Sequence, residues 1–251
     1  MKESILYLGD TMLTGAASYL AGVMHACGIA FDYLPSGEKF SSSLLTPAAK
    51  AVIISDYPAK NFSCDQLDFL AQKVTEGMGL LMIGGWESFT GVGGGYNKTV
   101  ISKVLPVVMQ DSDDRVNCSQ PCLIEKAKDH KIIDSLPFER SPPCIGGFNT
   151  LTAKSGAEII LLARRFNVSF RSGSFRFRRL KEAHPLLVIG TYGKGKVCAF
   201  ATDVAPHWVG GLVDWGDRRI ETRAPGANPV EVGNWYAELL ANMVNWTAGK
   251  L

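Results

Sequence analysis

The chain has 251 residues, of which 46% are hydrophobic and 20% are charged, and its formal net charge is +2. This balance is typical of a folded globular protein and excludes a disordered chain, a coiled coil and a collagen-like repeat. Taken over the whole chain, the near-neutral charge also argues against a dedicated nucleic-acid-binding protein.

The beginning of the sequence lacks the apolar segment of a secretory signal. Its first apolar run, at residues 5–8, is soon interrupted by Asp10. No later window is long and apolar enough to span a bilayer. We therefore expect a cytoplasmic protein with no membrane partner, whose six cysteines are reduced thiols.

The first half of the chain alternates apolar runs with helical patterns. Ser63 is the expected N-cap of the second helix and Gly77 its expected stop. Continuous apolar strands separated by amphipathic helices indicate a parallel sheet covered on both faces. The predicted strands are residues 5–8, 31–34, 51–55 and 80–83, and the predicted helices are residues 15–27 and 65–76.

The second half is richer in strands. A short helix is expected near residues 99–105, and a tight turn at 193–195 joins the last two strands. A closing helix is expected to begin at Asn228 and Pro229. The fold class is thus α/β, a single domain over residues 1–251 with an antiparallel β extension in its C-terminal half. The predicted strands of this half are residues 121–125, 149–153, 158–165, 186–192 and 196–202.

Three segments follow predicted strands at their carboxyl ends. They are residues 56–58, 84–95 and 203–208. In open parallel α/β sheets, ligands bind in the crevice outside these strand ends. We therefore expect a functional site where the three segments meet.

Two of these segments carry a family resemblance. The sequences Gly-Gly-Trp-Glu-Ser-Phe (residues 84–89) and Asp-Val-Ala-Pro-His-Trp (203–208), with the tryptophan-containing closing helix, resemble a family of putative glutamine amidotransferases. The resemblance covers most of the chain and implies the flavodoxin-like fold of the class I superfamily. It also implies a mostly parallel sheet with helices on both faces.

The resemblance does not extend to the catalytic residues of active members. Those members place a nucleophilic cysteine on the turn after the equivalent strand and a histidine–glutamate pair after a later strand, because the thiolate attacks the glutamine amide and the histidine transfers its proton. Here the turn reads Gly84-Gly85-Trp86, and the later strand is followed by Thr202-Asp203-Val204. Glutaminase activity is therefore not expected. Cys64, near a helix N-terminus, is the best substitute thiol, but a small residue at a helix start accounts for it.

Two functions remain for these loops. The first is a non-catalytic domain that binds a small molecule or protein partner through Gly85, Trp86, Phe89 and Trp208. The second is a hydrolase that uses some of the candidate catalytic residues Glu87, Ser88, Asp203 and His207. The Gly-x-Ser-x-Gly elbow of such hydrolases is missing, and structural hydrogen bonding of Glu87 and Ser88 to the neighbouring strand is the simpler interpretation.

No cofactor or metal is predicted. The glycine-rich loop at residues 91–99 has Asn97 before Lys98 and Thr99, which departs from a phosphate-binding Gly-Lys-Thr sequence. Cys118, Cys122 and Cys144 lack the paired spacing of structural zinc sites.

A basic segment stands apart from the rest. Residues 164–181 contain six arginines, one lysine and no acid, so this segment carries +7 and the remainder of the chain −5. Ser172-Gly173-Ser174 predicts a hairpin tip, and Phe175 and Phe177 alternate with arginines. A solvated or oligomer-forming hairpin is favoured. The alternative is contact with an anion or a nucleic acid through Arg171, Arg176, Arg178 and Arg179.

Overall fold

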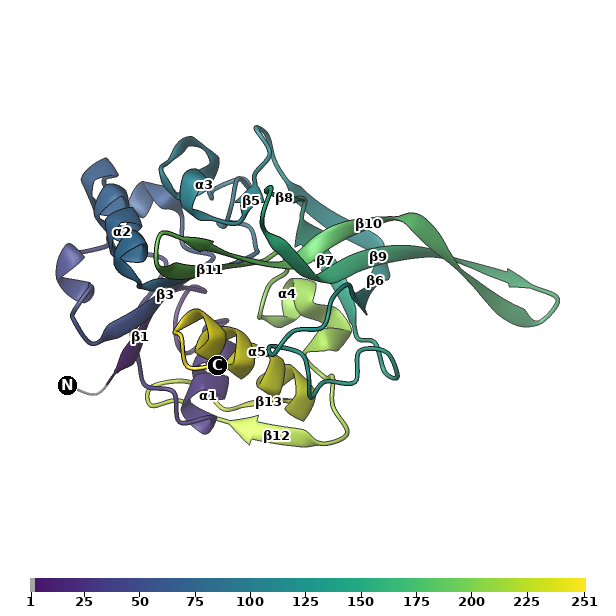
Figure 1. Cartoon of the computed structure of the whole chain (residues 1–251). Helices are drawn as coiled ribbons and strands as arrows, with labels where there is room; N and C mark the ends of the chain where they lie inside the picture. The colour runs from purple at the N-terminus through teal and green to yellow at the C-terminus, as the bar shows by residue number, and fades with distance from the viewer. Residues whose placement is uncertain (1–2) are drawn as a thin grey trace.

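The computed structural model describes residues 3–251 and is built around one nine-stranded mixed sheet (Figure 1). Its strand order is β2-β1-β3-β4-β11-β10-β9-β6-β7. The parallel strands are β1 (Ser4–Gly9), β2 (Phe31–Leu34), β3 (Ala49–Ser55), β4 (Gly79–Ile83) and β11 (Gly195–Phe200). The antiparallel strands are β6 (Arg115–Lys126), β7 (Cys144–Asn149), β9 (Glu158–Arg171) and β10 (Ser174–Tyr192).

The prediction of an α/β fold is confirmed, but the sheet is not mostly parallel. Four neighbouring strand pairs are parallel and four are antiparallel, because every strand beyond β11 runs against its neighbour. Strand β11 is the junction, since it pairs in parallel with β4 and antiparallel with β10. Two small ladders complete the strands: β5 (Val107–Val108) pairs with β8 (Thr152–Ala153), and β12 (Arg219–Thr222) pairs with β13 (Val230–Gly233).

Helices cover both faces of the parallel part (Figure 1). Helix α2 contacts β11 from one face, and α5 contacts β4 and β11 from the other. The α-helices are α1 (Ser18–Ala26), α2 (Cys64–Glu76), α3 (Ile101–Val104), α4 (Pro206–Val209) and α5 (Asn234–Thr247). The 3-10 turns are η1 (Ser42–Leu44), η2 (Ala59–Asn61), η3 (Tyr96–Lys98) and η4 (Gly210–Leu212). In the part of the chain that the structure describes, no helix is long and apolar enough to cross a membrane.

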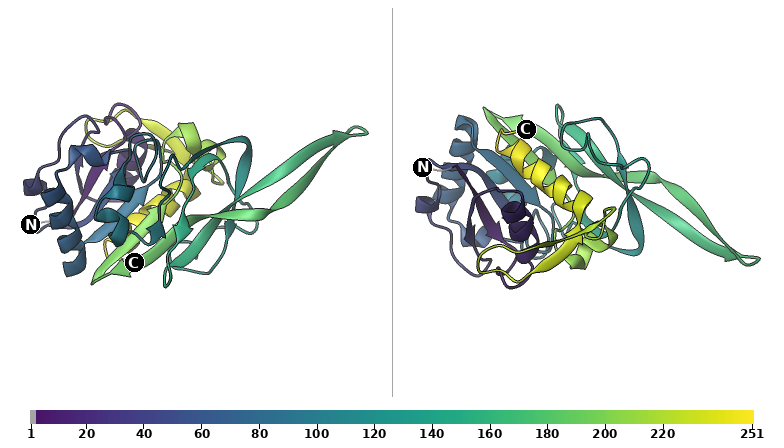
Figure 2. Two further views of the ribbon diagram at one scale, coloured as in Figure 1. Left: turned by 90° about the horizontal axis from the view of Figure 1, so that it is seen from above. Right: turned by 90° about the horizontal axis from the view of Figure 1, so that it is seen from below.

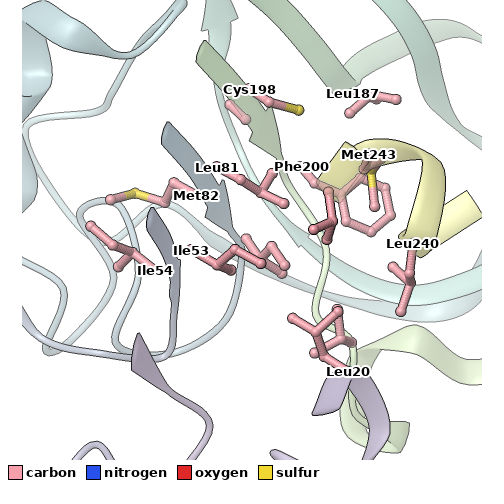
Figure 3. Packing of buried hydrophobic residues seen from close by; sticks show 14 of the residues in the cluster. Leu20, Ile53, Ile54, Leu81, Met82, Leu187, Cys198, Phe200, Leu240 and Met243 are labelled. Carbon is pink, nitrogen blue, oxygen red and sulfur yellow. The ribbon is translucent and has the colours of Figure 1, made fainter. Parts of the chain in front are cut away.

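The core lies between the parallel strands and these helices. Figure 3 shows side chains of β3, β4, β10 and β11 packed with Leu20 of α1 and with Leu240 and Met243 of α5. The apolar strand sequences are buried on both sides of the sheet, as the runs without polar alternation predict.

Local signals placed α2 correctly, whereas they misplaced the start of the closing helix. Ser63 and Gln66 form the reciprocal hydrogen bonds of a capping box, and Gly77 ends α2 with a φ of 128°. The predicted start at Asn228 is wrong, because Val230–Gly233 pairs with β12 as strand β13 and α5 begins only at Asn234. The Asn234 side chain instead accepts hydrogen bonds from the backbone N–H groups of Asp217 and Arg218.

Two other predicted elements differ from the structure. The strand predicted at residues 149–153 is divided between the end of β7 and the short β8. The predicted hairpin around Ser172-Gly173-Ser174 is present, and its strands β9 and β10 continue into the sheet, with register irregularities between Arg179 and Ala183 and between Pro185 and Val188. The outer part of this hairpin projects away from the rest of the molecule in every view (Figures 1 and 2).

Candidate functional site

Three aspartates meet at the carboxyl-end edge of the parallel strands. Asp10 directly follows β1, Asp56 directly follows β3, and Asp203 lies three residues beyond β11. Asp10 and Asp203 are buried, and Asp56 is half-buried. Asp203 is a residue predicted for the site, Asp56 lies in the predicted segment 56–58 without being named as a candidate, and Asp10 was not predicted. For Asp56 and Asp10 the only signal in the sequence is an acid placed directly after an apolar strand.

Backbone strain concentrates at the same edge. Within residues 3–251, the non-glycine residues with positive φ are Asp10 (50°), Thr11 (64°), Asp56 (42°), Phe89 (47°) and Ser172 (50°). Only Ser172 lies elsewhere, at the hairpin tip. Non-glycine residues adopt this region at a cost of order 1–3 kcal/mol each, and such positions cluster at functional sites.

Gly85 allows the Asp56 carboxylate to approach the backbone after β4. A Cβ atom at Gly85 would lie 2.1 Å from Asp56 Oδ1, and the φ of Gly85 is 150°. Asp56 Oδ1 accepts a hydrogen bond of 2.8 Å from the Glu87 N–H, and the Ser88 hydroxyl accepts one of 3.0 Å from the Asp56 N–H. The turn after β4 is thus tied to the end of β3 by atoms of both segments.

Burial raises the pKa values of the three carboxyls, and repulsion by neighbouring carboxylates raises those of Asp10 and Asp56 further. Desolvation is the main cause for each. The pKa of Asp56 rises to about 7, with a further contribution from the Asp203 charge. The pKa of Asp203 rises to about 6, although its Oδ1 accepts hydrogen bonds of 2.6 and 3.0 Å from the N–H groups of Val204 and Ala205. The pKa of Asp10 rises well above its usual range despite hydrogen bonds from Tyr7 and Ser55.

Asp114 and Asn149 hold the glycine-rich loop in place. The Asp114 carboxylate accepts hydrogen bonds from the N–H groups of Thr90 (3.1 Å) and Gly91 (2.9 Å) and from Asn149 Nδ2 (2.8 Å). The Asn149 side chain also accepts from the Gly85 N–H at 3.0 Å and donates to the Gly85 carbonyl at 3.2 Å. The segment from Gly85 to Gly91 is therefore fixed at both ends by two buried side chains that lie farther along the chain.

Three of the four backbone amides of the turn after β4 have acceptors. The Gly84 N–H donates to the carbonyls of Phe200 and Thr202, the Gly85 N–H donates to Asn149, and the Glu87 N–H donates to Asp56. These three amides are therefore not free to bind the oxyanion of an acyl-transfer intermediate.

Trp86 is an exposed aromatic platform beside these carboxyls. Trp86 is 45% exposed, although its ring contacts the side chains of Arg115 and His207. The Arg115 guanidinium lies 4.3 Å from the ring centroid, and the His207 ring meets Trp86 edge-on at 5.6 Å. Arg115 is itself held by two hydrogen bonds of 2.8 Å to Asp113.

The other residues predicted for the site differ in burial and in their hydrogen bonds. Phe89 is fully buried, and Trp208 is buried with its Nε1 donating to Asn117 at 2.7 Å, so both belong to the packed interior. Ser88 is also fully buried. Among residues 3–251, no hydrogen bond joins His207 to Glu87, Ser88 or Asp203, whereas the structural bonding of Ser88 to the end of β3 is present.

The cysteines lie away from the turn after β4. Cys64 is the first residue of α2, and Cys198 is buried in β11. Cys118 and Cys122 lie 3.3 Å apart at an irregularity of β6, and their contact lowers the pKa of Cys118 to about 7. Within the described residues, no group of three or more histidine, cysteine, aspartate or glutamate side chains has the arrangement of a metal site.

Two solved structures, both of cytoplasmic proteins of Salmonella typhimurium, are similar to this structure over almost the whole chain. One, from strain LT2, is 29% identical, with a TM-score of 0.74 over 97% of this chain and 99% of that chain. The other is 23% identical, with a TM-score of 0.73 over 97% of this chain and 98% of that chain. Their description agrees with the localisation predicted from the sequence.

A third solved structure is less similar, and at its low sequence identity it shows only that the fold is shared. A ThuA-like protein from Bacteroides uniformis is 12% identical, with a TM-score of 0.53 over 98% of this chain and 91% of that chain. No curated protein matches the sequence. The family model described as "Putative glutamine amidotransferase" matches residues 49–218. This range includes the turn after β4, the hairpin and Asp203, and the chain therefore belongs to that family.

Proposed function

We propose that this protein binds a small polyhydroxylated molecule at the carboxyl-end edge of its sheet and does not transfer an amide group from glutamine. The observation that carries the proposal is the turn after β4. A Cβ atom at Gly84 would lie 2.5 Å from the Ala201 carbonyl oxygen, and one at Gly85 would lie 2.1 Å from Asp56. A nucleophilic side chain has no space at either position.

The groups around Trp86 support the choice of ligand. An exposed aromatic ring offers a flat apolar surface, and neighbouring carboxyls that are partly protonated near neutral pH both donate and accept hydrogen bonds to hydroxyl groups. Asp56 and Glu87 are half-buried, so they remain within reach of solvent. The Arg115 cation on Trp86 is paired with Asp113, so the ionised fraction of the carboxyls disfavours an anionic ligand and favours a neutral or cationic one.

The strand order supports the flavodoxin-like ancestry that the sequence motifs imply. The parallel strands follow the order 2-1-3-4-5 when β11 is counted as the fifth. In this order, ligands bind where the direction of strand addition reverses, between β1 and its neighbour β3. Asp10 and Asp56 follow those two strands. A cytoplasmic binding protein of this ancestry is our overall assignment.

Hydrolysis is a second candidate, and the raised pKa values favour it. Values near 6 and 7 place Asp203 and Asp56 in the range suited to general acid and base catalysis. In this alternative the two aspartates replace the Glu87, Ser88 and His207 relay. It predicts turnover of p-nitrophenyl esters or glycosides that Asp56→Asn and Asp203→Asn both abolish.

The experiment has two parts. The first measures ammonia release from L-glutamine by the purified full-length protein, with background rates expected; release above background that requires one of the six cysteines contradicts the proposal. The second measures binding of D-glucose, D-glucosamine and D-glucuronate by titration calorimetry. We expect the first two to bind more tightly than the anionic sugar.

Variants then locate the binding. Trp86→Ala and Asp56→Asn should each weaken binding about tenfold, a loss of about 1.4 kcal/mol. Phe69→Ala is the matched control, because Phe69 of α2 also carries a cation, Lys73, at 5.3 Å from its ring centroid. Equal losses in the control and in Trp86→Ala place the binding elsewhere.

A further inference from the structure

The outer hairpin, residues 164–181, is here called the arm. It consists of the outer parts of β9 and β10, and both views in Figure 2 show it extending beyond the helices and the rest of the sheet. Ser174 pairs with Arg171 next to the tip, and Arg179 pairs with Phe166 near the base. At the base of the arm, Glu125 forms ion pairs with Arg164 and Arg179. The arm makes no other ion pair among the described residues.

The two faces of the arm differ in chemistry. Residues that pair directly across an antiparallel ladder share a face, so the register assigns each side chain. The largely apolar face carries Phe166, Val168, Phe170, Phe175 and Phe177, with Arg179 opposite Phe166 at the base. The opposite face is polar and carries Asn167, Ser169, Arg171, Ser174, Arg176 and Arg178. The phenylalanines contact one another, with centroid distances of 4.9 Å for Phe170–Phe175 and 6.0 Å for Phe166–Phe177.

This apolar face is largely open to solvent. Phe170, Phe175 and Phe177 are 62%, 67% and 70% exposed. At about 200 Å² for a phenylalanine, these three rings leave roughly 400 Å² of apolar surface exposed. Contiguous apolar patches of that size mark interaction sites, and an isolated two-stranded ribbon has no second layer to cover one.

The body of the same chain offers a surface of matching chemistry. The exposed apolar side chains Met12 (52%), Trp86 (45%) and Val92 (71%) all lie on loops at the carboxyl-end edge of the parallel strands. Acidic side chains accompany them, namely Glu87 and the exposed Asp111, and the Arg115 cation that lies on Trp86 is itself paired with Asp113. The arm carries +7 and the chain outside it a net −5, which favours association of the arm with the acidic side chains of this edge.

We propose that the arm of one copy of this protein packs on the carboxyl-end edge of a second copy. The phenylalanine face contacts Met12, Trp86 and Val92, and the long arginine side chains reach around the narrow ribbon toward Glu87 and Asp111. In a twofold pair the contact is made twice. Each contact buries roughly 400 Å² on the arm and a similar area on its partner, so the pair buries roughly 1,600 Å², the size of a stable interface.

Nucleic acid fits the arm less well. Binding of a single strand combines stacked bases with cations that follow the same backbone. Here the rings and most of the arginines point to opposite faces, and the rings are packed against one another rather than spaced for bases. The acidic remainder of the chain would also repel a polyanion.

Sedimentation velocity of the full-length protein tests the proposal. The wild type should form a pair at micromolar concentration, and high salt should weaken it. The arm variant Phe175→Ser/Phe177→Ser and the body variant Val92→Ser should each raise the dissociation constant at least tenfold. Leu251→Ser is the matched control: Leu251 is an exposed apolar residue at the opposite edge, where its carbonyl contacts Lys196 near the start of β11.

Several results would overturn this assignment. A wild type that stays monomeric, or a pair that the arm variant leaves intact, removes the arm as an interface. A pair that requires the phenylalanines but not Val92 indicates packing of arm against arm. A monomer whose arm binds a fluorescent oligothymidylate establishes the nucleic-acid alternative instead.

Hydrogen exchange supplies a readout independent of variant folding. Amides of residues 164–181 and of the loop around Val92 should become more protected together as the protein concentration rises. Protection of one without the other contradicts the pairing of these surfaces. The arm and a small ligand would compete for Trp86, so both measurements are made without ligand. Failure of the function proposed above therefore leaves this test unaffected.

Discussion

The site edge and the arm depart from ordinary folding chemistry in opposite ways. At the site edge the protein buries carboxyls that ionise more readily in water, as the raised pKa values of Asp56 and Asp203 indicate. In the arm it exposes phenylalanines that are more stable when buried. Neither arrangement stabilises the isolated chain, which is what the contacts with other molecules proposed above would require. Three measurements test this contrast.

The largest difference is expected between two phenylalanines in neighbouring strands. Phe200 of β11 is fully buried, whereas Phe177 of β10 is 70% exposed. Phe200→Ala should cost about 3–5 kcal/mol of unfolding free energy. Phe177→Ser should change it by less than about 0.5 kcal/mol. Urea denaturation at a concentration where the protein is monomeric checks both values, and comparable losses would show that the arm is part of the cooperative core.

Two glycines with positive φ give the next largest difference. Gly85→Ala should cost about 3 kcal/mol, because the new methyl group meets the Asp56 carboxylate in addition to the backbone strain. Gly173→Ala at the arm tip has no atom within 4 Å of the new Cβ, so only the strain of about 1 kcal/mol remains. Denaturation midpoints measure the two costs. If Gly85→Ala is as mild as Gly173→Ala, the turn after β4 has room for a side chain.

The smallest effect concerns pH. Because the pKa of Asp203 is raised in the folded state, the folded protein binds more protons than the unfolded chain between about pH 4 and pH 6. The unfolding free energy therefore falls as pH rises through that window. Asp203→Asn keeps an oxygen acceptor for Val204 and Ala205 and should stabilise the protein by about 2 kcal/mol at pH 8. The advantage should disappear near pH 4.

Asp68→Asn on the exposed side of α2 is the control for this pH series. It should change stability by less than about 0.5 kcal/mol at either pH. Thermal unfolding across the pH range measures both variants. A destabilised Asp203→Asn at pH 8 would mean that the ionised carboxylate is needed for folding.

Predictions from the sequence succeeded where the deciding interactions are local. The capping box of α2 lies within four residues, and the alternation of phenylalanine with arginine is enough to predict a two-faced hairpin. The start of α5 was misplaced because a pairing with β12 overrides the local helix signals at Asn228 and Pro229. The pairing of two separate strands, and not the local sequence, therefore decides where α5 begins.

The site was predictable only in outline for the same reason. The edge proposed for ligand binding follows from the strand pattern, and Trp86 and Asp203 are the residues that the sequence predicts there. Asp10 joins them from a distant part of the chain, through the order in which β1, β3 and β11 assemble. Asn149, which fixes Gly85, comes from the antiparallel half. No local pattern connects such residues.

Strand β10 belongs both to the arm and to the central sheet, and this has a consequence for how the arm can vary. Its outer residues form the arm, while Leu186–Ile189 are buried in the sheet, with no loop between them. A single residue inserted between tip and sheet would exchange the two faces of the arm, unless a bulge absorbs it as the irregularities after Arg179 do. Insertion of two residues in each strand at the tip preserves both faces and lengthens the arm by about 7 Å. Under the proposed pairing, the distance between the two copies would therefore change in steps of two residues per strand while the core stays the same.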